Sequence, residues 1–142
     1  MNAPIRNAIL KVGGALLVAL GVLHLAVTPT IARFVTQSTT RAAGTWLLPP
    51  MLLNHVVVGL LLLPLGAITF YAAPHAARAE RWALAVVRIS AVSIALLPVA
   101  LFALMGRQYF EAIPFIVATA IVCLACIVLL AAAFWPAPRD RR

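Results

Sequence analysis

The chain has 142 residues, of which 65% are hydrophobic and 10% are charged, and its mean hydropathy is +1.09. A soluble domain of this length cannot bury that much apolar surface, so the composition indicates an integral membrane protein. The formal net charge of +8 would suggest a nucleic-acid partner in a soluble protein. We expect no nucleic acid here, because basic residues also gather beside membrane spans, where they set the topology and attract anionic lipid.

Four apolar segments are long enough to cross a bilayer as helices. A hydrocarbon core about 30 Å thick needs roughly 20 helical residues, and segments 8–27, 51–73, 82–105 and 112–135 reach that length. None of them alternates in the manner of a barrel strand. The sequence therefore predicts an all-α fold, an integral membrane four-helix bundle that forms a single domain.

The basic residues predict how this bundle is oriented. If the N-terminus is cytoplasmic, eight of the 11 Lys and Arg residues fall on the inner side and three on the outer side. The inner set is Arg6, Lys11, Arg78, Arg81, Arg88, Arg139, Arg141 and Arg142, and the outer set is Arg33, Arg41 and Arg107. This distribution obeys the positive-inside rule. We therefore expect a multi-pass protein of the inner (cytoplasmic) membrane, N-in and C-in.

The first span is expected to end at Thr28-Pro29, which leaves residues 28–50 as a long outer loop. A connection of that length is unusual in a compact bundle and is often functional. Two interpretations of this segment stay open. Its apolar residues form one side of a short helix that lies on the outer membrane surface, or it is a solvated loop with a few apolar residues. In the first interpretation Trp46 anchors the segment at the interface.

Two histidines are the main candidates for a binding site. His24 lies three residues before the predicted outer end of the first span, and His55 lies four residues after the outer start of the second. At about 1.5 Å per residue, the two rings have similar depths. Glycines on the same helical stripes let the backbones come close; these are Gly14, Gly21, Gly59 and Gly66. We expect both imidazoles to face the bundle interior and each other.

Four uses of this pair stay open. The histidines can simply fix helix packing by hydrogen bonding. They can bind a small lipophile such as a quinone in a mostly apolar site. They can hold a b-type haem from opposite helices, or they can bind a metal ion. The further ligand-binding candidates near them are Asn54, Trp46, Tyr109 and Glu111, of which Glu111 is also a candidate metal ligand.

The remaining polar residues predict no catalytic centre. Cys123 and Cys126 have CxxC spacing, but they lie at mid-bilayer, where a thiolate has neither stabilisation nor access. The three acidic residues fall near span ends, so proton-coupled export has no deep carboxylate. His75 is expected to be a solvated residue of the inner loop. Arg88, about two turns into the third span, is expected to extend to the inner headgroups.

Residues 21–35, GVLHLAVTPTIARFV, resemble the first-helix exit of small four-helix membrane proteins of the DoxX-like group. In many of these a glycine, a histidine or lysine, and a proline lead into a short amphipathic segment. His24 and Pro29 match this pattern, whereas Asn54 and His55 have no counterpart in it. The resemblance implies an integral membrane subunit linked with quinone or thiol redox systems.

We therefore expect an accessory, non-catalytic membrane subunit that binds a quinone-like molecule near the outer leaflet. The alternatives are a haem or metal electron carrier that uses His24 and His55, and a purely structural subunit of a larger membrane complex. The expected partners are the lipid bilayer and either another membrane protein or a second copy of the chain.

Overall fold

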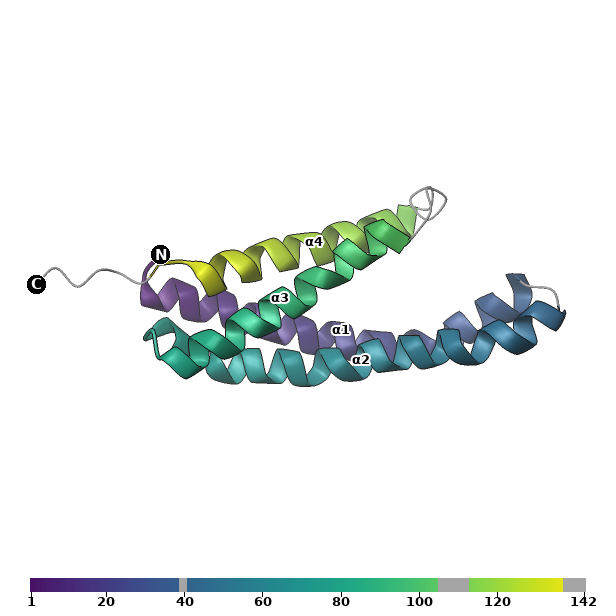
Figure 1. Cartoon of the computed structure of the whole chain (residues 1–142), viewed down its shortest axis with the longest axis horizontal. Coiled ribbons are helices and arrows are strands. Elements are labelled where there is room, and N and C mark those ends of the chain that lie inside the picture. Colours follow the sequence, from purple (N-terminus) through teal and green to yellow (C-terminus); the bar gives the residue numbers. More distant parts are fainter. Residues whose placement is uncertain (39–40, 105–112, 137–142) are drawn as a thin grey trace, which may run out of the picture. The chain divides into compact units, whose positions relative to one another are not determined.

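The computed structural model describes residues 1–38, 41–104 and 113–136, and over these residues it consists of four α-helices (Figure 1). The helices are α1 (Ala3–Ser38), α2 (Arg41–Ala77), α3 (Arg81–Leu104) and α4 (Ile113–Phe134). The prediction of an all-α fold is therefore confirmed.

Three stretches of helix in the described chain are long and apolar enough to cross a membrane: Ala3–Gln37, Trp46–Ala77 and Arg81–Leu104. This is compatible with a small integral membrane protein. The fourth helix has 22 residues and contains a shorter apolar stretch, Thr119–Phe134.

The expectation of a long outer loop after Thr28-Pro29 is wrong. Helix α1 does not end at Thr28-Pro29 but continues through Pro29 to Ser38, and α2 begins three residues later, at Arg41. Proline removes one backbone donor from a helix, but membrane helices tolerate this where side chains and neighbouring helices satisfy the backbone. Pro29 leaves the Leu25 carbonyl without its helical donor. The Thr28 hydroxyl donates to the neighbouring His24 carbonyl over 2.9 Å. Residues 28–38 and 41–50 therefore extend two helices.

These extensions make α1 and α2 much longer than a bilayer core requires. With 36 and 37 residues and a rise of about 1.5 Å per residue, each helix is roughly 55 Å long if straight. A hydrocarbon core measures about 30 Å. A helix of this length that crosses a membrane must tilt or continue beyond the hydrocarbon.

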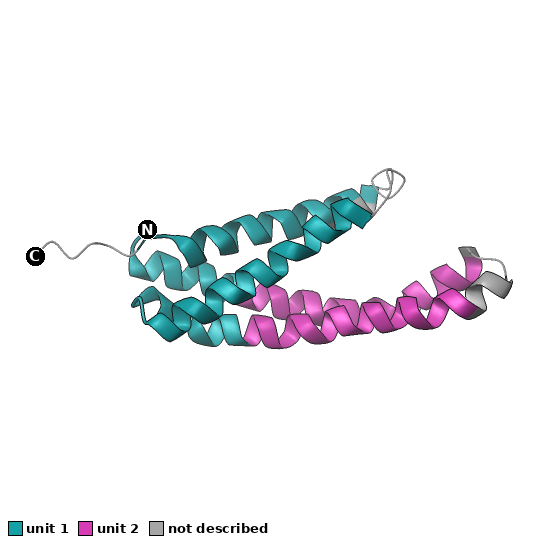
Figure 2. Cartoon of the chain, in the orientation of Figure 1, with its two compact units in different colours: residues 1–13, 68–142 teal, residues 14–67 magenta. Residues whose placement is uncertain are grey.

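The chain divides into two compact units, which Figure 2 colours separately. Unit 1 contains Met1–Gly13 and Ile68–Arg142, and unit 2 is Gly14–Ala67. In unit 1, α3 and α4 lie side by side. The buried residues of unit 1 include many alanines, and a Cβ at Gly13 would meet the Leu129 side chain. Small residues at these positions allow membrane helices to pack closely.

Unit 2 is an antiparallel pair formed by the remaining parts of α1 and α2. A Cβ placed on Gly66 would lie 2.6 Å from the carbonyl oxygen of Gly14, and one placed on Gly21 would lie 2.9 Å from that of Gly59. The contact therefore advances by seven residues along each helix, in opposite directions. This is the heptad spacing of helices that wind around each other, and here the residues at the contact are glycines, which leave no side chain between the backbones.

Candidate functional site

The structure brings His24 of α1 and His55 of α2 together within unit 2. Their ring centroids are 4.7 Å apart and the ring planes are inclined by 28°, so the imidazoles are stacked. Both residues are half-buried. The expectation that the two rings face each other is therefore confirmed.

The glycine contact beside the histidines explains this stacking. Gly21 lies one turn before His24 on α1, and Gly59 lies one turn after His55 on α2. Because Gly21 and Gly59 approach backbone to backbone, the side chains one turn further along both helices come within stacking distance. A side chain at either glycine would push the helices, and with them the rings, apart.

The hydrogen bonds of the two rings differ. Nδ1 of His24 lies 3.2 Å from the carbonyl oxygen of Leu20. A carbonyl only accepts, so Nδ1 carries a proton, and in the neutral form of the ring Nε2 is then an acceptor. Nε2 of His55 is buried and has no hydrogen-bond partner within the described residues. An unpaired polar atom in apolar surroundings is costly, so this nitrogen is the place where the pair has unused hydrogen-bonding capacity.

Of the other predicted ligand-binding residues, the described part of the chain contains Asn54 and Trp46. Asn54 is exposed on α2, and Trp46 is 83% exposed near the start of the same helix. Tyr109 and Glu111 lie outside the described residues. The contact that the structure shows is the one between His24 and His55, and the role of the predicted residues in binding a ligand stays a prediction.

The stacked geometry does not fit the haem alternative. Two axial histidines bind a haem iron through ring nitrogens from opposite faces of the porphyrin, so the porphyrin separates them. Here the imidazoles lie face to face with centroids 4.7 Å apart, which leaves no space for a porphyrin between them. For the metal alternative, residues 1–38, 41–104 and 113–136 contain no cluster of three or more His, Cys, Asp or Glu side chains that can hold an ion.

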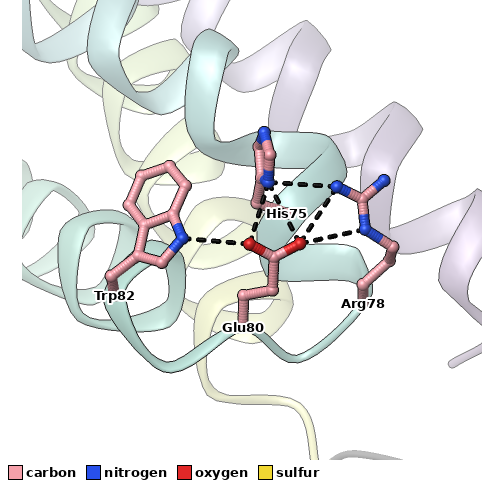
Figure 3. A network of polar contacts seen from close by, with 4 residues as sticks. All are labelled: His75, Arg78, Glu80 and Trp82. Carbon is pink, nitrogen blue, oxygen red and sulfur yellow. Dashed lines mark hydrogen bonds and ion pairs between the residues drawn. The ribbon is translucent and has the colours of Figure 1, made fainter.

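A polar network that the sequence did not reveal lies at the turn between α2 and α3 in unit 1 (Figure 3). His75 Nδ1 lies 2.9 Å from Glu80 Oε2, Arg78 Nε donates to Glu80 Oε1 over 3.0 Å, and Trp82 Nε1 donates to Glu80 Oε2 over 3.0 Å. These contacts lower the pKa of Glu80, chiefly through the hydrogen bond from His75. The expectation of a solvated loop histidine is therefore wrong, because His75 belongs to the last turn of α2 and pairs with Glu80.

The same turn carries an unusual backbone conformation. Ala79 has a φ of 61°, in the left-handed region that favours glycine. The Glu80 amide donates to the His75 carbonyl over 3.1 Å, and the Ala79 amide donates to the Ala76 carbonyl over 3.0 Å. These are the two bonds of a Schellman motif, which ends a helix with its last carbonyls satisfied. The motif positions Glu80 beside His75.

The signal for this network was present in the sequence as His75, Arg78, Glu80 and Trp82 within eight residues. A carboxylate beside two basic side chains predicts ion pairing, but only the positive φ at Ala79 turns the chain so that all four side chains meet.

No protein-family model matches the chain, and no curated protein or solved structure matches it either.

Proposed function

We propose that this protein is a small four-span protein of the inner membrane, N-in and C-in, that binds a quinone-like lipophile at the His24–His55 pair as an accessory subunit of a redox complex. The distribution of eight inner and three outer basic residues supports the orientation. The apolar helices support the membrane setting. The resemblance of residues 21–35 to the DoxX-like group, through His24 and Pro29, supports the link with redox systems, although here α1 continues through Pro29.

The single observation that supports binding of a quinone-like ligand is the unpaired Nε2 of His55 beside the stacked ring of His24. A quinone carbonyl needs an N–H donor, which His55 supplies when Nε2 carries the proton. The reduced quinol carries an O–H, which needs an acceptor, and His24 Nε2 is one because Nδ1 donates to Leu20. The pair therefore offers one partner for each redox state. Since the His55 nitrogen is covered by the chain itself, binding requires the side chains that cover it to move.

A structural subunit is the second candidate function. The observation that favours it is the close glycine contact of unit 2, which by itself explains why two imidazoles stack. In that case the rings stabilise the helix pair and have no affinity for a carbonyl compound. The two functions differ in whether a lipophile binds.

The test is binding of a benzoquinone with one isoprenyl unit to the full chain in phospholipid nanodiscs, measured as the excess over partition into empty nanodiscs. We expect saturable binding to the wild type and its loss in the double variant His24→Leu/His55→Leu. The matched control is His75→Leu, which removes the third histidine and keeps the pair. Equal excess binding by the double variant and the control contradicts the proposal. Circular dichroism checks that all three proteins stay helical.

A further inference from the structure

Two arginines of unit 1 converge on the C-terminal end of α4. Arg6, in the first turns of α1, is only 4% exposed. Its Nε donates to the Ala132 carbonyl over 2.9 Å, and its Nη2 donates to the Ala133 carbonyl over 3.0 Å. The last four carbonyls of a helix have no partner along the helix itself. Arg6 therefore supplies the donors that α4 lacks at its end.

Arg88 of α3 reaches the same place from the surface. Its Nε donates to the Ala133 carbonyl over 3.3 Å, and its guanidinium lies 5.3 Å from the centroid of the Phe134 ring. Two guanidinium groups thus share one carbonyl oxygen. A helix end carries only about half a negative charge, so it does not neutralise two full positive charges.

No carboxylate of the described chain compensates this charge. The only acidic side chain within residues 1–38, 41–104 and 113–136 is Glu80, which pairs with His75 and Arg78. Within the same residues, neither Nη group of Arg88 has a hydrogen-bond partner. Arg88 is exposed, so these groups are accessible to a ligand.

We infer that Arg88, backed by the buried Arg6, binds the phosphate of an anionic phospholipid headgroup. A guanidinium fork matches the oxygens of a phosphate with two parallel hydrogen bonds. Arg88 makes this contact. Arg6 does not touch the phosphate but holds the end of α4 in place and adds a second positive charge behind it.

The surroundings place this group at the depth of lipid headgroups. Trp82 at the start of α3 and Trp135 just after α4 are both exposed, and tryptophan is enriched at the membrane–water interface. Arg88 lies seven residues after the first residue of α3, close enough to the helix end for its side chain to extend to the interface. A headgroup phosphate is therefore the anion that the site meets most often, and inorganic phosphate shares its chemistry.

The experiment measures retention of phosphatidylglycerol against phosphatidylcholine by the full chain in mixed nanodiscs, with bound lipid counted by native mass spectrometry. We expect the wild type to retain phosphatidylglycerol preferentially. In the variant Arg88→Gln the ratio of retained phosphatidylglycerol to phosphatidylcholine should fall about fivefold, since one arginine near an anionic surface contributes about 1 kcal/mol. Arg88→Lys should keep part of it, because the charge remains and the fork is lost. Arg33→Gln, an exposed arginine of unit 2, is the matched control and should stay within about twofold of the wild type.

Three results would overturn the inference. The first is equal retention of the two lipids by the wild type. The second is equal loss in Arg88→Gln and Arg33→Gln. The third is a preference for phosphatidylglycerol that the wild type lacks and only Asp140→Asn shows. In that case the Asp140 carboxylate, and not a lipid phosphate, is the counter-ion of Arg88. A parallel titration in detergent compares inorganic phosphate with phosphatidylglycerol as stabilisers of the wild type against unfolding. If inorganic phosphate stabilises the protein and phosphatidylglycerol does not, the ligand is not the lipid. The inference requires the membrane setting but not the histidine pair, so His24→Leu/His55→Leu should retain phosphatidylglycerol as the wild type does.

Discussion

Replacing Gly66 with alanine should weaken the packing of unit 2. The added Cβ would lie 2.6 Å from the Gly14 carbonyl oxygen and 2.7 Å from the Val18 amide nitrogen, both of them backbone atoms that cannot rotate away. Ordinary contact begins near 3.4 Å, so the two backbones must part by about 0.8 Å at this point. Overpacking of this kind costs about 1–3 kcal/mol, against which the better helix propensity of alanine returns about 1 kcal/mol. We expect a net loss of up to about 2 kcal/mol.

The assay is reversible unfolding of the purified chain from mild detergent into dodecyl sulfate, followed by circular dichroism. Gly21→Ala should cost less, because its Cβ would lie 2.9 Å from the Gly59 carbonyl, a milder clash. Ala67→Val adds volume at an exposed neighbouring position and is the matched control. If Gly66→Ala is as stable as the wild type, or if Ala67→Val loses as much, the backbone contact between the helices is not what holds unit 2 together.

Two further predictions concern the turn between α2 and α3. Ala79→Gly should raise the free energy of unfolding by about 1 kcal/mol, because glycine adopts the left-handed conformation without the Cβ penalty; the same unfolding assay checks it, and a destabilised variant would contradict the left-handed conformation at Ala79. The Glu80 network should stabilise the protein above the ordinary pKa of a glutamate and lose that contribution as the pH falls through the lowered pKa of Glu80, since a depressed carboxylate pKa favours the ionised, folded form. Unfolding midpoints measured across acidic pH should therefore show a loss in the wild type that Glu80→Gln lacks, and parallel curves for the two proteins would refute this role.

The meeting of His24 and His55 could be predicted because it depends on local properties. Helical periodicity fixes which face a residue occupies, and counting residues from the span ends fixes its depth. Both rules hold for each helix separately, and the glycines on the same faces indicated that the two backbones come close. The sequence therefore identified the pair from two helices before their contact was known.

The extent of α1 could not be predicted in the same way. Thr28-Pro29 is a good local signal for the end of a helix, but whether the chain stops there depends on what lies beside it. Here the residues after Pro29 extend α1, and Val35 is buried. Burial against neighbouring residues overrides the local preference of one proline.

The contacts of Arg6 and Arg88 were missed for a related reason. In the sequence both are basic residues near the predicted inner ends of spans, which explains their charge by topology alone. Their partners are the carbonyls of Ala132 and Ala133, which are main-chain atoms that any residue carries. A pattern of side chains gives no indication of which helix end lacks donors and lies within reach.

The most direct test of the histidine pair is the nitrogen chemical shift of His55 in chain labelled with ¹⁵N-histidine and reconstituted in phospholipid nanodiscs. On titration with the short-chain benzoquinone, we predict that the Nε2 resonance of His55 moves and then saturates, while the resonances of His75 stay in place. If the His55 resonance does not move, or if all three histidines shift alike, the stacked imidazoles serve helix packing and bind no quinone-like ligand.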